Sequence, residues 1–421
     1  MRYCFNHRYI PLEKEKTRVY LKFVCLKRGE TLLRSKGVTN NMESKTTLSF
    51  QDIKFQKESK NIRAVFLHNY YFLLSEEELN AIGAFEVKEG ALIFEQREKR
   101  VHNKFNQLLQ KGFNNLYHRI GKKKTLYIHQ NSGIPLMGTN EFGLVDRGTN
   151  IIEVKPLTGC NLRCTFCSVS EGIENGKRDI IVEEEYLINE FKKLIAIKKN
   201  PVEANIGPQG EPLLYPKIVE LVADLKKAGA SVVSINTNGT MLNEKLIDEF
   251  EKAGLDRFNM SLHTTSQEKA NKIMGGIQNI ERLKQMIAYC KGKIDVLLAP
   301  VLIPTVNDED VDGILDVAKS IKNKKWPSIG IQNFLSYPGG RNPGGIVERP
   351  WKEFYKILEE KEKEKGISLM LKGHLEIFNV QEEEQLPKPF RKGEVISVDI
   401  ISLGRNKNEW FGVAKERAIT V

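Results

Sequence analysis

The sequence predicts an α/β protein in which the middle of the chain forms a parallel sheet, arranged as a partial, TIM-type (β/α)6 barrel. Apolar strand-like runs alternate with helical segments from residue 151 to about residue 335, which is the pattern of βαβ units. The first 150 residues are strongly basic and mix strand-like with helical patterns, which predicts an N-terminal basic α+β region. The last thirty residues contain strand-like runs, which predict a small C-terminal β segment.

The N-terminal region is expected at residues 1–145. Strand-like runs occur at residues 17–25 and 64–74, and residues 98–120 resemble an amphipathic helix. Basic and aromatic side chains are interleaved on that helix, including Lys104, Phe105, Lys111, Phe113 and Tyr117. In RNA-binding proteins cations hold phosphates and aromatic rings stack on bases. The alternative is that the aromatic rings pack in the core and the lysines lie in water.

The barrel is expected at residues 146–345. Six strands are predicted, at residues 151–157, 202–207, 231–236, 257–263, 294–303 and 328–335. Helices are predicted between them, at residues 182–198, 216–228, 243–253, 267–290 and 308–322. Active sites of such barrels gather at the C-terminal ends of the strands, so functional residues are expected in the loops that follow the strands.

Two further segments follow the barrel. The Gly- and Pro-rich residues 338–345 are interpreted as a connection rather than a lid. They lead to a helical and strand extension at residues 346–382, which contains a charged helix at residues 351–365. The last segment is expected at residues 383–421.

Composition places the chain among globular proteins and limits its compartment. Hydrophobic residues make up 40% and charged residues 28% of the 421 residues. No apolar run approaches the ~20 residues of a membrane span, and the N-terminus has no signal-peptide core. We therefore expect a cytoplasmic protein that does not bind a membrane.

The basic residues are unevenly distributed along the chain. Residues 1–150 carry 26 Lys and Arg against 15 Asp and Glu, whereas the remainder carries 39 of each. The net charge of +11 thus lies in the first third, which suggests a polyanionic partner or simply a solvated surface.

Three cysteines lie within eight residues, at Cys160, Cys164 and Cys167, directly after the first predicted barrel strand. Close, fixed cysteine spacing in a cytosolic protein usually indicates metal or redox chemistry. A structural zinc site needs four ligands, and no fourth Cys or paired His lies nearby. Three thiolates suit an iron–sulfur cluster that keeps one iron open to a substrate or cofactor.

The spacing Cys-x3-Cys-x2-Cys, with Phe166 before the last cysteine, resembles the signature of the radical S-adenosylmethionine (radical SAM) superfamily. The resemblance implies one [4Fe-4S] cluster on the three cysteines and S-adenosylmethionine on the open iron. It implies reductive cleavage of the sulfonium S–C5′ bond to methionine and a 5′-deoxyadenosyl radical. It also implies an external electron donor such as ferredoxin or flavodoxin, and a partial (β/α)6 barrel.

A second element follows the second predicted strand, where residues 207–212 read Gly-Pro-Gln-Gly-Glu-Pro. This resembles the Gly-Gly-Glu-Pro element of the same family. By that resemblance the carbonyl groups of Gln209 and Gly210 and the carboxylate of Glu211 hold the methionine ammonium group. A carboxylate or carbonyl facing a cationic nitrogen forms a charge-assisted hydrogen bond, so these residue types suit the task.

Polar residues follow the later strands. Asn236 and Asn238 come after the third strand, Ser261 after the fourth and Asn307 after the fifth. The resemblance places them, together with Phe166, among the contacts of S-adenosylmethionine, whereas an Asn-Gly pair is also a common tight turn. His263 is either a proton donor, a substrate contact or a satisfied polar group at a strand end. No general acid or base is assigned.

The tail from residue 392 resembles the opening strands of a TRAM domain, a small OB-like barrel found in RNA-modifying enzymes. OB barrels bind single strands with stacking aromatics and a basic groove, and Trp410, Phe411, Arg405, Lys407 and Lys415 are the candidates here. The chain stops short of a full barrel, and a plain hairpin is the alternative.

These observations favour a radical SAM enzyme that modifies an RNA nucleoside, with tRNA as the expected substrate. A peptide- or protein-modifying or activating radical SAM enzyme is the alternative, and a non-catalytic RNA-binding protein is the third hypothesis. Cys4, Cys25 and Cys290 lack the spacing of an auxiliary cluster.

Overall fold

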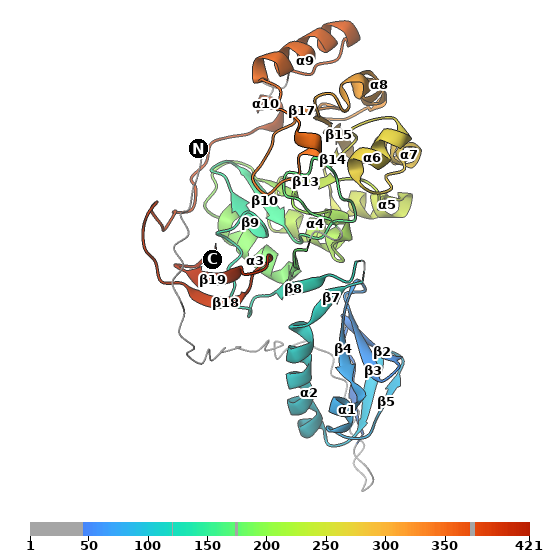
Figure 1. Ribbon diagram of the computed structural model, residues 1–421, viewed down its shortest axis with the longest axis vertical. Coiled ribbons are helices and arrows are strands. Elements are labelled where there is room, and N and C mark those ends of the chain that lie inside the picture. The colour runs from blue at the N-terminus through green and yellow to red at the C-terminus, as the bar shows by residue number, and fades with distance from the viewer. Residues whose placement is uncertain (1–44, 120, 173–175, 371–374) are drawn as a thin grey trace.

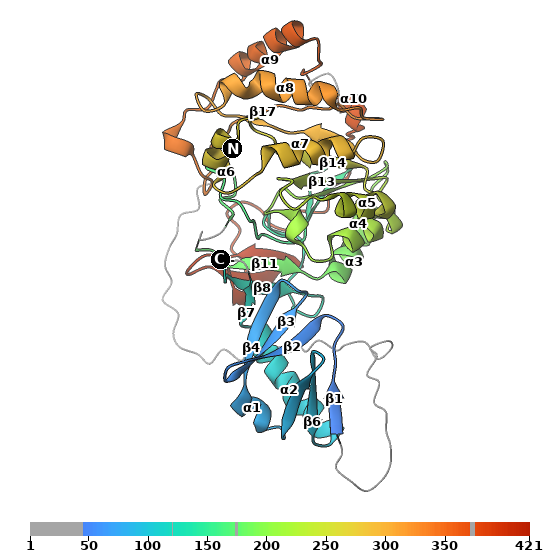
Figure 2. The same ribbon diagram turned by 90° about the vertical axis from the view of Figure 1, so that its right-hand side faces the viewer.

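The computed structural model describes residues 45–119, 121–172, 176–370 and 375–421. The N-terminal sheets and helix α2 (Glu98–Phe113) lie at one end of the long axis and the barrel lies at the other (Figure 1). Strands β7 (Leu116–His118), β8 (Lys124–Ile128) and β11 (Asp179–Val182) lie between the two ends (Figure 2). The strand predicted at residues 17–25 falls outside the described residues.

The larger N-terminal sheet has six strands in the order β11, β8, β7, β4, β3, β2. Its remaining strands are β2 (Ile53–Glu58), β3 (Asn61–Phe66) and β4 (Tyr70–Ser75). The single strand predicted at residues 64–74 is wrong, because this stretch is the β3–β4 hairpin. Leu67 and His68 make its turn with φ of 47° and 61°. Tight hairpin turns favour Gly, Asn or Asp at such positions, so a Leu-His turn gives no sequence signal.

A smaller sheet and two helices complete the N-terminal region. The sheet consists of β1 (Lys45–Leu48), β6 (Ala91–Glu95) and β5 (Phe85–Lys88), and helix α1 (Glu76–Asn80) lies between β4 and β5. Helix α2 is shorter than predicted, because the chain turns at Asn114 and enters β7. Phe105 is 1% exposed and Phe113 packs on the same core, so these two aromatic rings are packing residues rather than base-stacking residues.

The barrel sheet confirms the predicted mixed α/β fold and its parallel strands. In order it contains β15 (Asp295–Leu298), β14 (Arg257–Met260), β13 (Val232–Thr237), β12 (Glu203–Ile206), β10 (Ile151–Lys155) and β9 (Gly143–Asp146). The five strands from β10 to β15 are mutually parallel, whereas the short edge strand β9 is antiparallel and was not predicted.

The sixth parallel strand continues the sheet as a separate ladder. The strand predicted at residues 294–303 is interrupted at Pro300, which lacks the N–H needed for a continuous ladder. Beyond it, β16 (Val301–Leu302) pairs in parallel with β17 (Gln332–Asn333). A bridge between Leu298 and Ile329 joins this ladder to β15, and the result is a curled, open half-barrel.

Helices cover the outer face of the half-barrel (Figure 2). They are α3 (Glu184–Ile195), α4 (Ile218–Lys227), α5 (Glu244–Ala253), α6 (Gln267–Met274), α7 (Ile280–Tyr289) and α8 (Val311–Ser320). Local sequence sets their ends, as α5 shows. The Asn243 side chain accepts a hydrogen bond from the Leu246 N–H, and Gly254 ends the helix with φ of 86°. None of the helices in the described part of the chain combines the length and apolar character that crossing a bilayer requires.

The C-terminal part returns toward the middle of the molecule (Figure 1). After helix α9 (Trp351–Lys365) and the short α10 (Leu375–Phe378), the chain forms an antiparallel sheet of β18 (Asp399–Leu403), β19 (Trp410–Ala414) and β20 (Arg417–Thr420). An OB barrel has five strands, so this three-stranded sheet is two short. Trp410 is 44% exposed, but Phe411 is buried against Phe142 and does not stack on a ligand.

Candidate functional site

The three cysteines lie in the segment between the C-terminal end of β10 and the start of β11, described at residues 156–172 and 176–178 and called the cysteine loop. The loop is held against α6 by two main-chain hydrogen bonds, from the Arg163 N–H to the Met274 carbonyl and from the Thr165 N–H to the Ile273 carbonyl. Leu162 packs on the same two residues. The cysteine loop is therefore fixed to the barrel wall at the edge where active sites of parallel barrels form.

The three thiols are unpaired and partly exposed. Burial, and then the charge of Glu211, raises the pKa of Cys160 well above its usual range, and burial raises the pKa of Cys164 to about 12. Charges on Cys164 and Cys167 also raise the pKa of Cys160, so the three sulfurs lie near one another. As free thiols Cys160 and Cys164 are protonated at neutral pH, and a bound cation converts such thiols to thiolates.

The loop after β12 approaches the cysteine loop closely. The Glu211 N–H donates to the Gly159 carbonyl at 2.8 Å. Gly210 has φ of 66°, and a Cβ atom there would lie 2.4 Å from the Gly159 carbonyl oxygen. Only glycine permits this approach, which explains the residue type. No described residue donates a hydrogen bond to the main-chain carbonyl of Gln209 or Gly210, so both oxygens are available to a ligand.

Glu211 is a buried carboxylate, 2% exposed, held by three donors. Its Oε1 accepts from the Leu213 N–H at 3.0 Å and from the Thr237 hydroxyl at 2.7 Å. Its Oε2 accepts from the Asn238 N–H at 2.8 Å and has a further lone pair. No described Lys, Arg or His forms an ion pair with it, and burial raises its pKa. An unneutralised buried carboxylate suits a cationic ligand.

Asn238 and Asn161 tie the loop after β13 to the cysteine loop. The Asn238 Nδ2 donates to the Asn161 Oδ1 at 3.0 Å, and the Asn161 Nδ2 donates to the Thr240 hydroxyl at 2.8 Å. The Asn238 Oδ1 accepts from both the N–H and the hydroxyl of Thr240. Most of the hydrogen-bonding capacity of the Asn238 side chain therefore shapes the turn, and one amide hydrogen is left for a ligand.

Asn236 belongs to a ladder of asparagines on the inner face of the half-barrel. Its Nδ2 donates to the Asn205 Oδ1 at 2.8 Å, and its Oδ1 accepts from the Asn259 Nδ2 at 3.0 Å. Sequence reasoning missed Asn205 and Asn259. Asn259 lies directly opposite Asn236, and Asn205 lies opposite Ser234, two residues earlier on β13. Each asparagine interrupts an apolar strand, which is a signal that would have found them.

The other predicted residues lie at the ends of β14 and β16. Asn307 is buried, and its side chain bonds the Ile303 N–H and the carbonyls of His263 and Val301, so it shapes the turn rather than facing a ligand. The Ser261 side chain is half-buried. The Phe166 ring meets the His263 ring edge-on, with centroids 4.7 Å apart.

His263 is a buried residue after β14, and one of its two ring nitrogens is hydrogen-bonded to the main chain. It is 4% exposed, and its Nδ1 accepts a hydrogen bond from the Val301 N–H at 3.0 Å. Burial lowers its pKa to about 4, so the imidazole is neutral at physiological pH. Nδ1 therefore holds the Val301 main chain, and the ring proton lies on Nε2, where it can be donated in a hydrogen bond.

The Gly- and Pro-rich residues 338–345 do more than connect two elements, because they hold the cysteine loop. The Arg341 N–H donates to the Cys167 carbonyl at 2.9 Å, and its guanidinium donates to the carbonyls of Cys164 at 2.6 Å and Glu171 at 2.7 Å. A Cβ on Gly340 would lie 2.8 Å from the Ser168 carbonyl, so this close contact needs glycine. Sequence gave no signal for this contact.

Comparison with known proteins decides the family. Residues 154–318 match the family described as the radical SAM superfamily, a range that contains the three cysteines and Glu211. An uncharacterized protein of Methanocaldococcus jannaschii, MJ0103, is 40% identical over 331 residues, which cover 73% of this chain and 76% of that protein. The chain belongs to the radical SAM superfamily. It is a radical SAM enzyme, and the cofactors of such enzymes are a [4Fe-4S] cluster and S-adenosylmethionine.

Other similar proteins match less of the chain or match it at lower identity. GTP 3′,8-cyclase of Lactiplantibacillus plantarum is 32% identical over 181 residues, 41% of this chain and 52% of that protein, so the chain spans about half the length of this relative. The structure of Streptococcus suis SuiB bound to S-adenosylmethionine is 13% identical, covers 77% of this chain and 71% of that one, and has a TM-score of 0.40. This structural similarity is too low to support a conclusion about substrate.

The donor set fits a radical SAM cluster better than a single metal ion. Among the described residues, no three Cys, His, Asp or Glu side chains converge closely enough to hold one metal ion. A cluster spreads its thiolate ligands over several iron atoms and so accepts sulfurs that are near but not convergent. Cys290, by contrast, is 1% exposed at the end of α7, and Cys4 and Cys25 lie outside the described residues.

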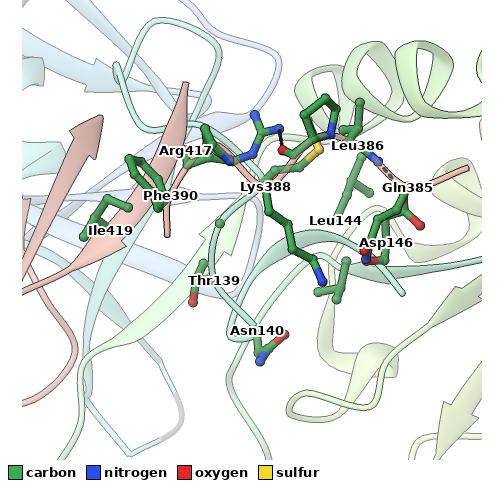
Figure 3. Close-up of a pocket in the computed structure, with 15 residues that line it drawn as sticks. Thr139, Asn140, Leu144, Asp146, Gln385, Leu386, Lys388, Phe390, Arg417 and Ile419 are labelled. Carbon is green, nitrogen blue, oxygen red and sulfur yellow. Dashed lines mark hydrogen bonds between the residues drawn. The ribbon is translucent and has the colours of Figure 1, made fainter. Parts of the chain in front are cut away.

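A separate cavity of about 310 Å³ lies between β9 and the C-terminal segment (Figure 3). Figure 3 shows the Lys388 side chain extending across it toward Asn140, while the Arg417 guanidinium donates to the Pro387 carbonyl. None of the predicted radical SAM residues lines this cavity. It is distinct from the cysteine site.

Proposed function

We propose that Cys160, Cys164 and Cys167 hold the [4Fe-4S] cluster and that Gln209, Gly210 and Glu211 bind the methionine end of S-adenosylmethionine. The observation that carries this proposal is the buried, unneutralised carboxylate of Glu211 beside the cysteine loop. A methionine ammonium group neutralises that charge and fills the acceptor sites left open in this loop. We propose that Phe166, Asn236, Asn238 and Ser261, which follow β10, β13 and β14, contact the rest of the cofactor.

The protein's own part in the reaction is binding and orientation. When bound and reduced, the cluster supplies the electron that splits the S–C5′ bond of S-adenosylmethionine to methionine and a 5′-deoxyadenosyl radical. Glu211 fixes the amino acid end of the cofactor, and the Asn161–Asn238 contact keeps the two loops at a constant separation. Asn307 contributes indirectly, because its side chain holds the turn after β16 in place. An external electron donor is required.

The first test measures this chemistry directly. Anaerobically reconstituted protein, supplied with dithionite and S-adenosylmethionine, is expected to form 5′-deoxyadenosine and methionine in equal amounts. Chromatography with mass detection measures both products. Reconstituted protein that holds four irons but forms neither product would exclude the proposal.

We also propose a cytoplasmic location, because partly exposed thiol ligands persist in a reducing compartment.

We further propose that the substrate is an RNA nucleoside, with tRNA as the expected carrier. Support comes from the outer face of the large N-terminal sheet. Directly opposed residues there form one row across five strands: Lys54, Val65, Tyr71, Tyr117 and Lys124. Two stacked tyrosines thus lie between two exposed lysines, with ring centroids 5.9 Å apart and an interplanar angle of 29°.

This row has the features of a single-strand binding surface. Base–aromatic stacking contributes about 1–3 kcal/mol per base, and lysines hold phosphates without sequence preference. The Arg63 guanidinium lies 4.4 Å from the Tyr71 ring centre but is neutralised by Glu58, so it supports the ring rather than binding phosphate. The predicted C-terminal candidates contribute less, because Arg405 is buried and Lys415 pairs with Glu394.

The RNA proposal has a matched pair of variants. Replacing Tyr71 and Tyr117 with alanine is expected to weaken tRNA binding at low salt by ~10-fold or more, because at least one stacked base loses its partner. Fluorescence anisotropy with labelled tRNA measures the change. Tyr355→Ala on α9, which removes a tyrosine stacked on Trp351 at the far end of the molecule, serves as the control. Equal binding by both proteins would exclude the tyrosine row as the RNA-binding surface. No tRNA binding by the wild type would exclude RNA and favour a peptide substrate.

A further inference from the structure

A buried arginine from the C-terminal sheet reaches the radical SAM site. Arg405 lies in the turn between β18 and β19, and its side chain is 0% exposed. Its Nη1 and Nη2 lie 2.7 Å and 2.8 Å from the two carboxylate oxygens of Glu171, and its Nε donates to the Arg178 carbonyl at 3.1 Å. Glu171 belongs to the cysteine loop. The tail therefore forms a two-pronged ion pair with the segment that carries the three cysteines.

Glu171 passes this contact on to the loop after β12. Its Oε1 also accepts a hydrogen bond from the Gln209 Nε2 at 2.6 Å, and both side chains are buried. Its main-chain carbonyl accepts from the Arg341 guanidinium at 2.7 Å. Glu171 is thus the junction of the cysteine loop, residues 338–345, the C-terminal sheet and the Gln209 side chain.

The turn that presents Arg405 is itself held in place. The Glu409 carboxylate accepts hydrogen bonds from the main-chain N–H groups of Arg405 and Asn406 at 2.8 Å and 2.9 Å. A second carboxylate, Glu141, lies 3.3 Å from the Arg405 Nη1. The Arg405 cation therefore faces the buried carboxylate of Glu171 and the partly exposed carboxylate of Glu141. Loss of the charge or of the planar, two-pronged geometry of the guanidinium would disrupt this arrangement.

We propose that Arg405 and Glu171 are positioning residues for S-adenosylmethionine. Through Gln209 they fix the main-chain oxygens of Gln209 and Gly210 at the place where these receive the ammonium group. Neither residue touches the cofactor, and both act through Gln209. This inference rests on the proposed cofactor contacts of residues 209–211, and it assigns the C-terminal sheet a role in cofactor binding rather than in RNA binding.

The test uses Glu171→Gln, Arg405→Gln and the double variant in the full-length, anaerobically reconstituted protein. Each single variant leaves one charge buried without its partner, whereas the double variant removes both charges and allows a neutral amide pair to form. Three readouts are followed: iron content, the KM for S-adenosylmethionine against kcat, and the change that added S-adenosylmethionine causes in the electron paramagnetic resonance spectrum of the reduced cluster.

Both single variants are expected to keep the cluster and to raise the KM for S-adenosylmethionine by ~10–100-fold, as loss of an outer-shell partner typically does, with a smaller change in kcat. The spectral change should need correspondingly more cofactor. The double variant should recover part of the loss. Arg417→Gln, on the same C-terminal sheet but bonded to the Pro387 carbonyl, should behave as wild type.

Three results would overturn the inference: an unchanged KM in both single variants, a loss of iron that parallels the loss of affinity, or an equal loss in Arg417→Gln. Arg405→Lys keeps the charge and supplies a folded variant should Arg405→Gln not fold, and it is expected to give a smaller rise in KM. If wild-type protein holds its cluster yet shows no spectral response to S-adenosylmethionine, the proposed cofactor site itself fails. If the wild-type spectrum responds to S-adenosylmethionine and the variants have an unchanged KM, only the positioning role of Arg405 and Glu171 is overturned, and the proposed cofactor site stands.

Discussion

Replacing Cys164 with alanine is expected to abolish both the cluster and the cleavage of S-adenosylmethionine. Cys164 is the middle of the three proposed ligands, and the described residues offer no spare thiol near the loop, because Cys290 is buried at the end of α7. Two thiolates cannot hold three irons of the cluster. The loss of activity should exceed the ~10–100-fold cost typical of an outer-shell substitution. Iron and sulfide analysis, the visible absorption of the cluster and 5′-deoxyadenosine formation measure the result.

Cys290→Ala is the matched control, since it removes a thiol of the same chain without touching the loop. It should retain the cluster and full activity, with at most a small loss of stability from the lost sulfur. The thermal midpoint of Cys164→Ala should stay close to that of the apo wild type, because Cys164 contributes mainly a contact with the Met274 sulfur, 3.9 Å away. A Cys164→Ala protein that still cleaves S-adenosylmethionine would contradict the proposal that Cys160, Cys164 and Cys167 bind the cluster.

Replacing Glu211 with glutamine is expected to weaken the binding of S-adenosylmethionine while leaving the cluster in place. A hydrogen bond to a charged partner contributes about 1.5–3 kcal/mol, which corresponds to a roughly 10–150-fold rise in Kd. Glutamine is close to isosteric and keeps one oxygen for the Leu213 N–H and the Thr237 hydroxyl. Equilibrium binding of S-adenosylmethionine to the reconstituted protein measures the change, and iron content shows that the ligands are intact.

The control for Glu211 is Glu203→Gln, at the start of β12, the strand that leads into the loop carrying Glu211. Glu203 is also a buried carboxylate, but it pairs with Arg257 at the N-terminal end of the barrel. This variant should lose stability and keep its affinity for S-adenosylmethionine. Similar affinities in Glu211→Gln and the wild type would show that the ammonium group lies elsewhere.

Acidification provides an independent check on Glu211. Burial raises its pKa, and the ammonium group is bound by the ionised form, so affinity should fall as pH drops through this raised pKa. The fall should begin above the range of an ordinary glutamate, near 4.3. The affinity of Glu211→Gln for S-adenosylmethionine should not show this fall at low pH, because glutamine does not titrate.

Local sequence patterns predicted most barrel elements. Helix α5 follows from its Asn243 cap and its terminal Gly254, and β12, β13 and β14 follow from short apolar runs between helical segments. The predictions were wrong where the local signal was absent, as at the turn of Leu67 and His68, or where a proline divided one strand into β15 and β16. In each case the sequence pattern was apolar on both sides of the break, so periodicity alone could not find it.

In the candidate site, too, local motifs could be predicted from the sequence, whereas contacts between distant segments could not. Cys160, Gly210 and Glu211 could be predicted as site residues because the motifs that contain them are local in the sequence. Arg341 and Arg405 were missed as partners of the cysteine loop, because their contacts with Glu171 span 170 and 234 positions along the chain. Arg405 was interpreted instead as a surface residue for RNA, since nothing in its neighbourhood distinguishes a buried arginine from an exposed one.

The sequence by itself determined the parallel half-barrel and the cluster-binding chemistry, because periodicity and the interval between thiols are encoded over a few residues. The tertiary structure alone decided which side chains hold the cofactor loops in place, that β11 joins the N-terminal sheet, and that two tyrosines meet across β4 and β7. Those outcomes depend on burying charge and aromatic surface between segments far apart in the chain. That free energy exists only once the chain has folded.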